Sequence, residues 1–416
     1  MINLIFNIKE SEKFYVEKVN ILGNNITQED VIRNILLVDE GDPFNELLHN
    51  RSINKIKSLG FFNKVDSEIK NGLLKNQKII NINVSEKPTG EIMAGAGIGT
   101  NGGSIAFGIK ENNFLGRGIQ FGTDITISDE TIKGIVTLDN PNYKGSNRSL
   151  GTAIESSTTD RLKDFGYKSD KIGFGVNSGF EYYDDLFLNT GISSYLEKID
   201  TNATASAGMK KQNGSYFDTY LNYTFNYDKR NQSYQATDGY RSKFTQNFPL
   251  ISDSSTLVNS FDYKSYNKWI DENIATFSFY VASANSIIGR DIKLSDRLFL
   301  PANKMRGFVS GKIGPKDGTD YIGGNYAMSL NMATTIPQIL PNSQNTDFGF
   351  FIDAGNVWGV DFSSTNLGGS KIRSSAGLSL DYYSAIGPIN FSWAKAITKG
   401  QNDVVEFFRF NLGTTF

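Results

Sequence analysis

The sequence predicts a mainly β protein: a 16-stranded transmembrane antiparallel β-barrel preceded by one small α+β domain with the element order β-α-α-β-β. Helix and strand patterns mix up to about residue 90, whereas strand patterns follow one another from residue 91 to 416. In the later part, one face of each segment is apolar and often aromatic, and the other is small, polar or charged. The 41 glycines, 30 phenylalanines and 19 tyrosines favour strands joined by tight turns.

Composition excludes several classes of function. The chain has no cysteine, which rules out disulfides and thiolate metal sites. His49 is the one histidine, so a multi-histidine metal site is excluded. A formal net charge of −2 gives no global attraction to nucleic acid, and the glycine-rich stretches do not lead into helices as a phosphate-binding loop requires. We therefore expect no enzyme activity, no metal, no cofactor and no nucleic-acid partner.

The first domain is expected over residues 13–90. Val31, Ile32, Ile35 and Leu36 share one face of a helix, and Gly60 stands where a second helix should stop. The expected elements are a strand over residues 14–22, a helix capped by Thr27, a helix over 45–59, and strands over 61–69 and 78–86. Residues 1–12 are interpreted as the remnant strand of a preceding repeat of the same kind, with a simple tail as the alternative.

The barrel is expected over residues 91–416. Ile119, Phe121 and Ile125 alternate with polar or small residues, as do many later segments. We expect 16 strands, since an even number is required when both ends of such a barrel lie on the periplasmic side. The pattern gives 17 segments, because residues 272–300, counted as 272–285 and 289–300, are interpreted as one hairpin with uncertain edges. Closure leaves no unpaired backbone in lipid, so spanning is compatible with low hydropathy. A large soluble β-sandwich or solenoid is the alternative.

Short motifs follow one another along the whole chain in a fixed order. They are EGD at 40–42, LGFF at 59–62, EKPTG at 86–90, NNFLGRG at 112–118, MRGF at 305–308, FIDAGNVW at 351–358 and FNLGTTF at 410–416. Together they resemble the BamA-type outer-membrane protein assembly factors, and the first domain resembles the POTRA repeat nearest the barrel in that family. The resemblance places the barrel in a bacterial outer membrane and the POTRA-like domain in the periplasm.

The resemblance implies a loop that folds into the barrel lumen. Its motif is Met305, Arg306, Gly307 and Phe308, and the acidic partner of the arginine on a neighbouring strand is Asp353. An arginine and an aspartate in a confined polar lumen should pair, bidentate where geometry allows. The following Gly323-Gly324 indicates a short loop, and the preceding 301–303 indicates a rigid entry.

The resemblance also implies a lateral gate between the first and last strands. In the first strand, Ile92, Gly95, Gly97 and Gly99 are the gate residues, and these glycines weaken a strand by removing packing. The closing strand carries the terminal signal of outer-membrane proteins, made up of Phe408, Phe410, Leu412, Gly413 and Phe416. An opened first strand would offer a free edge to an incoming strand.

The implied function is folding and insertion of β-barrel clients into the outer membrane through this gate, without nucleotide. The implied partners are unfolded outer-membrane clients, periplasmic accessory lipoproteins and outer-membrane lipid. The third strand and first helix of the POTRA-like domain are expected to offer a second edge for strand addition. A TamA-like factor or a two-partner-secretion polypeptide translocator of the same superfamily is the alternative.

Overall fold

The computed structural model describes residues 12–100, 102–233, 235–269, 273–337, 345–361, 371–384 and 387–413. The expected remnant strand at 1–12 therefore lies, apart from residue 12, outside the described residues. The chain forms two compact units. The first contains residues 1–91 with 109–122 and 138–147, and the second contains residues 92–108, 123–137 and 148–416.

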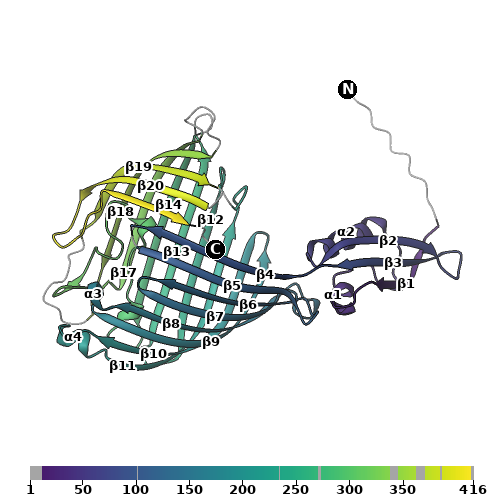
Figure 1. Ribbon diagram of the computed structural model, residues 1–416, viewed down its shortest axis with the longest axis horizontal. Helices are drawn as coiled ribbons and strands as arrows, with labels where there is room; N and C mark the ends of the chain where they lie inside the picture. The colour runs from purple at the N-terminus through teal and green to yellow at the C-terminus, as the bar shows by residue number, and fades with distance from the viewer. Residues whose placement is uncertain are drawn as a thin grey trace. The chain divides into compact units, whose positions relative to one another are not determined.

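The POTRA-like domain has the expected order β-α-α-β-β. Its elements are β1 (Tyr15–Leu22), α1 (Glu29–Arg33), α2 (Glu46–Ser58), β2 (Phe62–Asn71) and β3 (Gln77–Glu86), which form the purple part of the chain in Figure 1. Ile80, Ile82 and Val84 alternate with polar residues and are buried, as a strand with one face on a core requires. Ile32 of α1 and Ile56 of α2 are fully buried in the same core.

Two helix ends in this domain lie where the sequence predicts them, and one does not. The Asn45 side chain accepts hydrogen bonds from the backbone N–H groups of Leu47 and Leu48, which caps α2, and Gly60 follows it with φ +75°. Thr27 does not cap α1, because the helix begins one residue later, after Gln28. The backbone N–H of Thr27 instead donates to the Glu86 carboxylate at 2.6 Å.

The expectation that the third strand of this domain is an open edge is wrong. The sheet order is β1-β3-β2, with β1 parallel and β2 antiparallel to β3. Both sides of β3 are therefore hydrogen-bonded, because it carries the continuous apolar alternation that suits a central strand. The edges of this sheet are β1 and β2.

The predicted 16-stranded antiparallel barrel is confirmed (Figure 1). Its strands are β4 (Gly90–Gly99), β5 (Gly102–Phe114), β6 (Ile119–Ser128), β7 (Thr131–Asn140), β8 (Ser149–Arg161), β9 (Tyr167–Tyr183), β10 (Leu186–Thr201), β11 (Gly214–Asp228), β12 (Gly239–Ser252), β13 (Thr256–Lys268), β14 (Ile274–Ser286), β17 (Tyr326–Pro337), β18 (Thr346–Trp358), β19 (Arg373–Ser384), β20 (Gly387–Thr398) and β21 (Phe408–Gly413). Within the described residues, no helix is long and apolar enough to cross a membrane.

The segment 289–300 is not a strand of the barrel, which is why 17 candidate segments become 16 strands. It belongs to a loop that runs from residue 287 to 325, between β14 and β17. The loop is thus long rather than short, and it contains a 3₁₀ turn at Leu294–Asp296, another at Ala302–Lys304 and a small hairpin of β15 (Lys316–Asp317) and β16 (Asp320–Tyr321). The alternating apolar residues of this segment are buried, Ile292 and Leu294 each at 1% exposure.

Candidate functional site: the lumen loop and the barrel seam

The lumen loop, residues 287–325, folds onto the interior wall of the barrel around its MRGF motif. Met305 and Phe308 are almost fully buried, at 2% and 1% exposure. They pack in one apolar cluster with Leu300, Ile313, Ala327 and Val357. Because Ala327 belongs to β17 and Val357 to β18, the cluster attaches the loop to that side of the barrel.

Arg306 contacts Asp353 of β18 through both ends of its guanidinium. Nε donates to Oδ2 at 2.8 Å, and Nη2 donates to Oδ1 at 2.7 Å. The backbone N–H of Arg306 adds a third bond to Oδ2 at 3.0 Å. Asp353 is fully buried, and the guanidinium carbon lies 3.4 Å from the ring centroid of Phe351. The structure therefore brings the two predicted residues together in a bidentate, desolvated pair with a cation–π contact.

Gly307 allows the motif to turn against the wall. Its φ is +85°, in the left-handed region, and a Cβ there would lie 3.1 Å from the Cβ of Ser375 and 3.2 Å from the Cβ of Ala394. The Ser375 hydroxyl donates to the Arg306 carbonyl at 2.5 Å. Glycine is thus required here for both conformation and close approach.

The loop has a second polar attachment, which the sequence analysis missed. Lys293 Nζ donates to Glu197 of β10 at 2.8 Å and to Asp218 of β11 at 2.7 Å. All three residues are nearly buried, at 4%, 5% and 1% exposure. Asp296 lies 3.7 Å from the same ammonium. No motif marks these residues; the one signal in the sequence is a lysine between two apolar residues, Ile292 and Leu294.

The seam is the contact between β21 and β4, and the part of it that the structure describes is short. Among the described residues it pairs Asn411, Leu412 and Gly413 with Gly99, Ile98 and Gly97. On its other side β21 pairs with β20 over residues 408–412. By contrast, β9 and β10 pair along the whole of residues 186–201.

Glycines at the seam permit a close approach of the two strands. A Cβ on Gly99 would lie 2.7 Å from the carbonyl oxygen of Phe410, and one on Gly413 would lie 2.8 Å from the Cα of Gly97. Ile92 and Gly95 lie earlier in β4, outside the three paired positions. The seam glycines therefore do more than remove side-chain packing. They also let the two strands approach, because larger residues would push the strands apart.

The remaining predicted residues of the closing strand lie as follows. Phe408 stacks with Phe391 of β20 and with Phe410, at ring-centroid distances of 6.4 Å each. Leu412 pairs with Ile389 on one side and Ile98 on the other. Phe416 lies outside the described residues.

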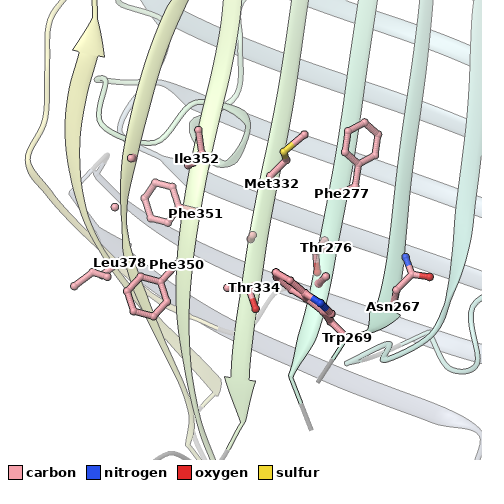
Figure 2. A pocket seen from close by; sticks show the side chains of 14 residues that line it. Asn267, Trp269, Thr276, Phe277, Met332, Thr334, Phe350, Phe351, Ile352 and Leu378 are labelled. Atoms are coloured by element: carbon pink, nitrogen blue, oxygen red, sulfur yellow. The ribbon is translucent and has the colours of Figure 1, made fainter. Parts of the chain in front are cut away.

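The outer face of β14, β17, β18 and β19 is apolar and grooved. The groove has a volume of about 790 Å³, and Figure 2 shows the bulky side chains that border it, with Met332, Phe350, Ile352 and Leu378 among them. Ile352 and Met332 are 57% and 50% exposed. Phe351, which precedes Ile352 in β18, is 3% exposed and packs against Arg306. Successive residues therefore face opposite sides of the wall, as in a membrane barrel.

Comparisons with known proteins follow the same division of the chain. Residues 113–416 match the model of the Omp85 superfamily domain. The chain belongs to the Omp85 superfamily. Residues 14–87 match the POTRA family, whose model is described as a surface antigen variable number repeat. The barrel is in the outer membrane and the POTRA-like domain is in the periplasm.

Individual relatives agree with this assignment. The chain is 26% identical over its full length to the outer membrane protein assembly factor BamA of Neorickettsia risticii and 23% identical to that of Neisseria meningitidis serogroup B. It spans 57% and 58% of those two proteins, somewhat more than half their length. The crystal structure of BamA from Haemophilus ducreyi lacking POTRA domains 1–3 superposes with a TM-score of 0.91 at 24% identity, covering 98% of this chain and 85% of that one.

Proposed function

We propose that this chain folds β-barrel clients and inserts them into the outer membrane through the seam between β4 and β21. One observation carries the proposal: the barrel, hydrogen-bonded along long strands elsewhere, pairs over three described residues at this seam. Antiparallel pairs are held by their ladder of backbone bonds and by cross-strand side chains. Among the described residues the seam has little of either, so we infer that it separates at low cost.

Opening the seam gives the protein a template for another strand. The backbone donors and acceptors of β4 would be left unpaired, and an unpaired edge binds an incoming strand by strand addition. Backbone bonds do not depend on the client's sequence, which suits many clients. The free energy comes from the client's own pairing and burial, so no nucleotide or enzymatic step is needed.

The lumen loop and the POTRA-like domain have supporting roles in this proposal. Arg306 and Asp353 keep the loop seated on the wall, because a buried charge without its partner is strongly unfavourable. The POTRA-like domain receives unfolded clients and accessory lipoproteins in the periplasm, and the apolar outer face contacts membrane lipid. The resemblance to BamA-type factors supports these partners.

A disulfide across the seam tests the gate directly. The native chain has no cysteine, so Ile98→Cys with Leu412→Cys introduces a single pair at directly opposed positions. The matched control is Val176→Cys with Ile192→Cys, an opposed and exposed pair on β9 and β10. Each variant is reconstituted in liposomes, and the folding rate of an unfolded barrel client is measured with the pair oxidised and reduced.

We expect oxidation of the seam pair to abolish acceleration of client folding and oxidation of the control pair to leave it unchanged. Equal acceleration with the seam locked would show that the seam is not the insertion site. If the protein gives no acceleration but conducts ions through its lumen, the translocator alternative becomes the better function.

A further inference from the structure

The closing strand is also held from inside the barrel, by a residue outside the MRGF motif. Arg409 is the second residue of β21. Its Nη1 donates to the carbonyl of Ala302 at 2.5 Å, and its Nη2 donates to the carbonyl of Phe308 at 2.6 Å. Both acceptors are backbone groups of the lumen loop, so the guanidinium joins two points of the loop to the strand that forms the seam.

The backbone just before β21 is paired with the same loop. Glu406 N donates to the Gly307 carbonyl at 3.0 Å, and Val309 N donates to the Val404 carbonyl at 2.9 Å. Phe308 and Val405 form an isolated antiparallel bridge. The residues leading into β21 thus lie against the MRGF segment as a short extra strand would.

Charge and burial make the Arg409 contact a strong one. Its side chain is 12% exposed, and Glu406, at 13%, accepts from Nε at 2.8 Å and from Nη2 at 2.6 Å. Glu406 neutralises the cation and fixes the plane of its guanidinium. Hydrogen bonds from a charged donor are stronger than neutral ones, and more so where water is excluded.

We propose that Arg409 is the positioning residue through which the lumen loop holds the closing strand against β4. Because the described residues give the seam only three backbone pairs, the inner attachment decides whether β21 stays in register. Displacement of the loop at Gly307 or Phe308 would then release the seam, which couples the motif to the gate. The gating consequence rests on the proposed function, whereas the positioning role does not.

The test is hydrogen–deuterium exchange of the full chain in liposomes, without any client. Arg409→Met keeps an unbranched apolar stem and removes the guanidinium with its donors. We expect peptides covering 92–99 and 408–413 to exchange at least about tenfold faster, the factor that corresponds to about 1.4 kcal/mol, while peptides of β9 and β10 are unchanged. Arg409→Lys, which keeps the charge but cannot span both carbonyls, should lie between wild type and Arg409→Met.

Two further variants separate positioning from general destabilisation. Arg241→Met removes a cation of β12 that donates to Asn226 of the neighbouring strand at 2.8 Å, and it should leave the seam unchanged. Arg409→Met with Glu406→Gln removes the unpaired carboxylate as well, and it should still loosen the seam. Seam exchange in Arg409→Met no faster than in Arg241→Met would overturn the proposal.

A client-folding assay on the same variants keeps the two proposals distinct. If the seam loosens in Arg409→Met and client folding changes with it, both stand. If the seam loosens without any change in client folding, Arg409 positions the strand and the lateral-gate function fails. If the seam does not loosen, the inference about Arg409 fails whatever the folding assay gives.

Discussion

The two sides of the barrel hold their strands in different ways. At β9 and β10, strands of 17 and 16 residues are paired along residues 186–201. At the seam, β21 has six residues and meets β4 over three described pairs. The long side is stabilised by its own backbone ladder, whereas the short side depends on contacts with the lumen loop.

The lumen loop connects these two sides, and its attachments differ in kind. Lys293 fixes it to β10 and β11 through two buried carboxylates. Arg306 fixes it to Asp353 of β18, and Arg409 reaches it from the closing strand. A loop that is fixed to a firm wall at one end can hold a weakly paired strand at the other, so substitutions at the two ends should differ in their effects.

The largest effect is expected for Lys293→Met. The substitution leaves Glu197 and Asp218 buried without their cation, and such a loss costs about 3–5 kcal/mol. The free energy of unfolding in urea measures it. The matched control is Lys304→Met, whose partner Asp262 is 40% exposed, and which should cost about 1 kcal/mol or less. Equal losses in the two variants would contradict a special role for the buried site.

Next comes the arginine pair. Arg306→Ala should cost about 3 kcal/mol, because the fully buried Asp353 loses its cation but still accepts from the backbone N–H of residue 306. Asp353→Ala should cost about 3 kcal/mol or less, because the remaining Arg306 is 20% exposed and can regain some water. The double variant should cost clearly less than the sum of the two, since the second substitution removes a charge already without its partner. Limited proteolysis of the loop should show faster cleavage near residue 306. Additive losses would mean that the two side chains do not act as a pair.

A smaller effect is expected at the seam glycine Gly99. Its substitution by alanine places a methyl 2.7 Å from the Phe410 carbonyl, and overpacking of this kind costs about 1–3 kcal/mol. Hydrogen exchange should rise at 408–413 and stay constant at β10. Gly134→Ala on β7 is the control, because nothing lies within 4 Å of that position. If Gly99→Ala raises hydrogen exchange at the seam no more than Gly134→Ala raises it in β7, the close-approach argument is wrong.

The smallest effect lies outside both sides of the barrel, at His49. Burial lowers its pKa below the ordinary 6.5, outweighing the opposite influence of Glu46. The unfolded chain therefore takes up the proton first, so the stability of the POTRA-like domain should fall as the pH drops below about 6.5. Since the chain has one histidine, its imidazole NMR signal can be titrated without overlap. A midpoint above 6.5 would contradict the burial argument, and His49→Gln should remove this contribution.

Most of the fold could be predicted from the sequence, because the spacing of apolar residues in each helix or strand depends on residues close together in the chain. The alternation of Ile80, Ile82 and Val84, and the glycine after residue 59, depend on neighbours close in the chain. Residues 289–300 show where this fails. Ile292, Leu294 and Leu300 alternate as a strand would, but they are buried in the lumen, and periodicity cannot tell which apolar surface a residue meets.

The site could be predicted only where a short motif carried it. Arg306 and Asp353 were found through the resemblance and lie together in the structure. Lys293 with Glu197, and Arg409 with the carbonyl of Phe308, join segments far apart in the sequence and have no pattern of their own. Every residue has a backbone carbonyl, so the sequence does not indicate which carbonyl a distant arginine contacts.

The pairing of 97–99 with 411–413 also has a consequence for how this protein itself folds. It joins segments more than 300 residues apart, whereas hairpins such as β9 and β10 join neighbours. Hairpins form early because little chain has to be closed, and the most distant pairing forms last. Until then β4 has an unpaired edge. The unfinished barrel therefore exposes the same edge that would later bind a client strand.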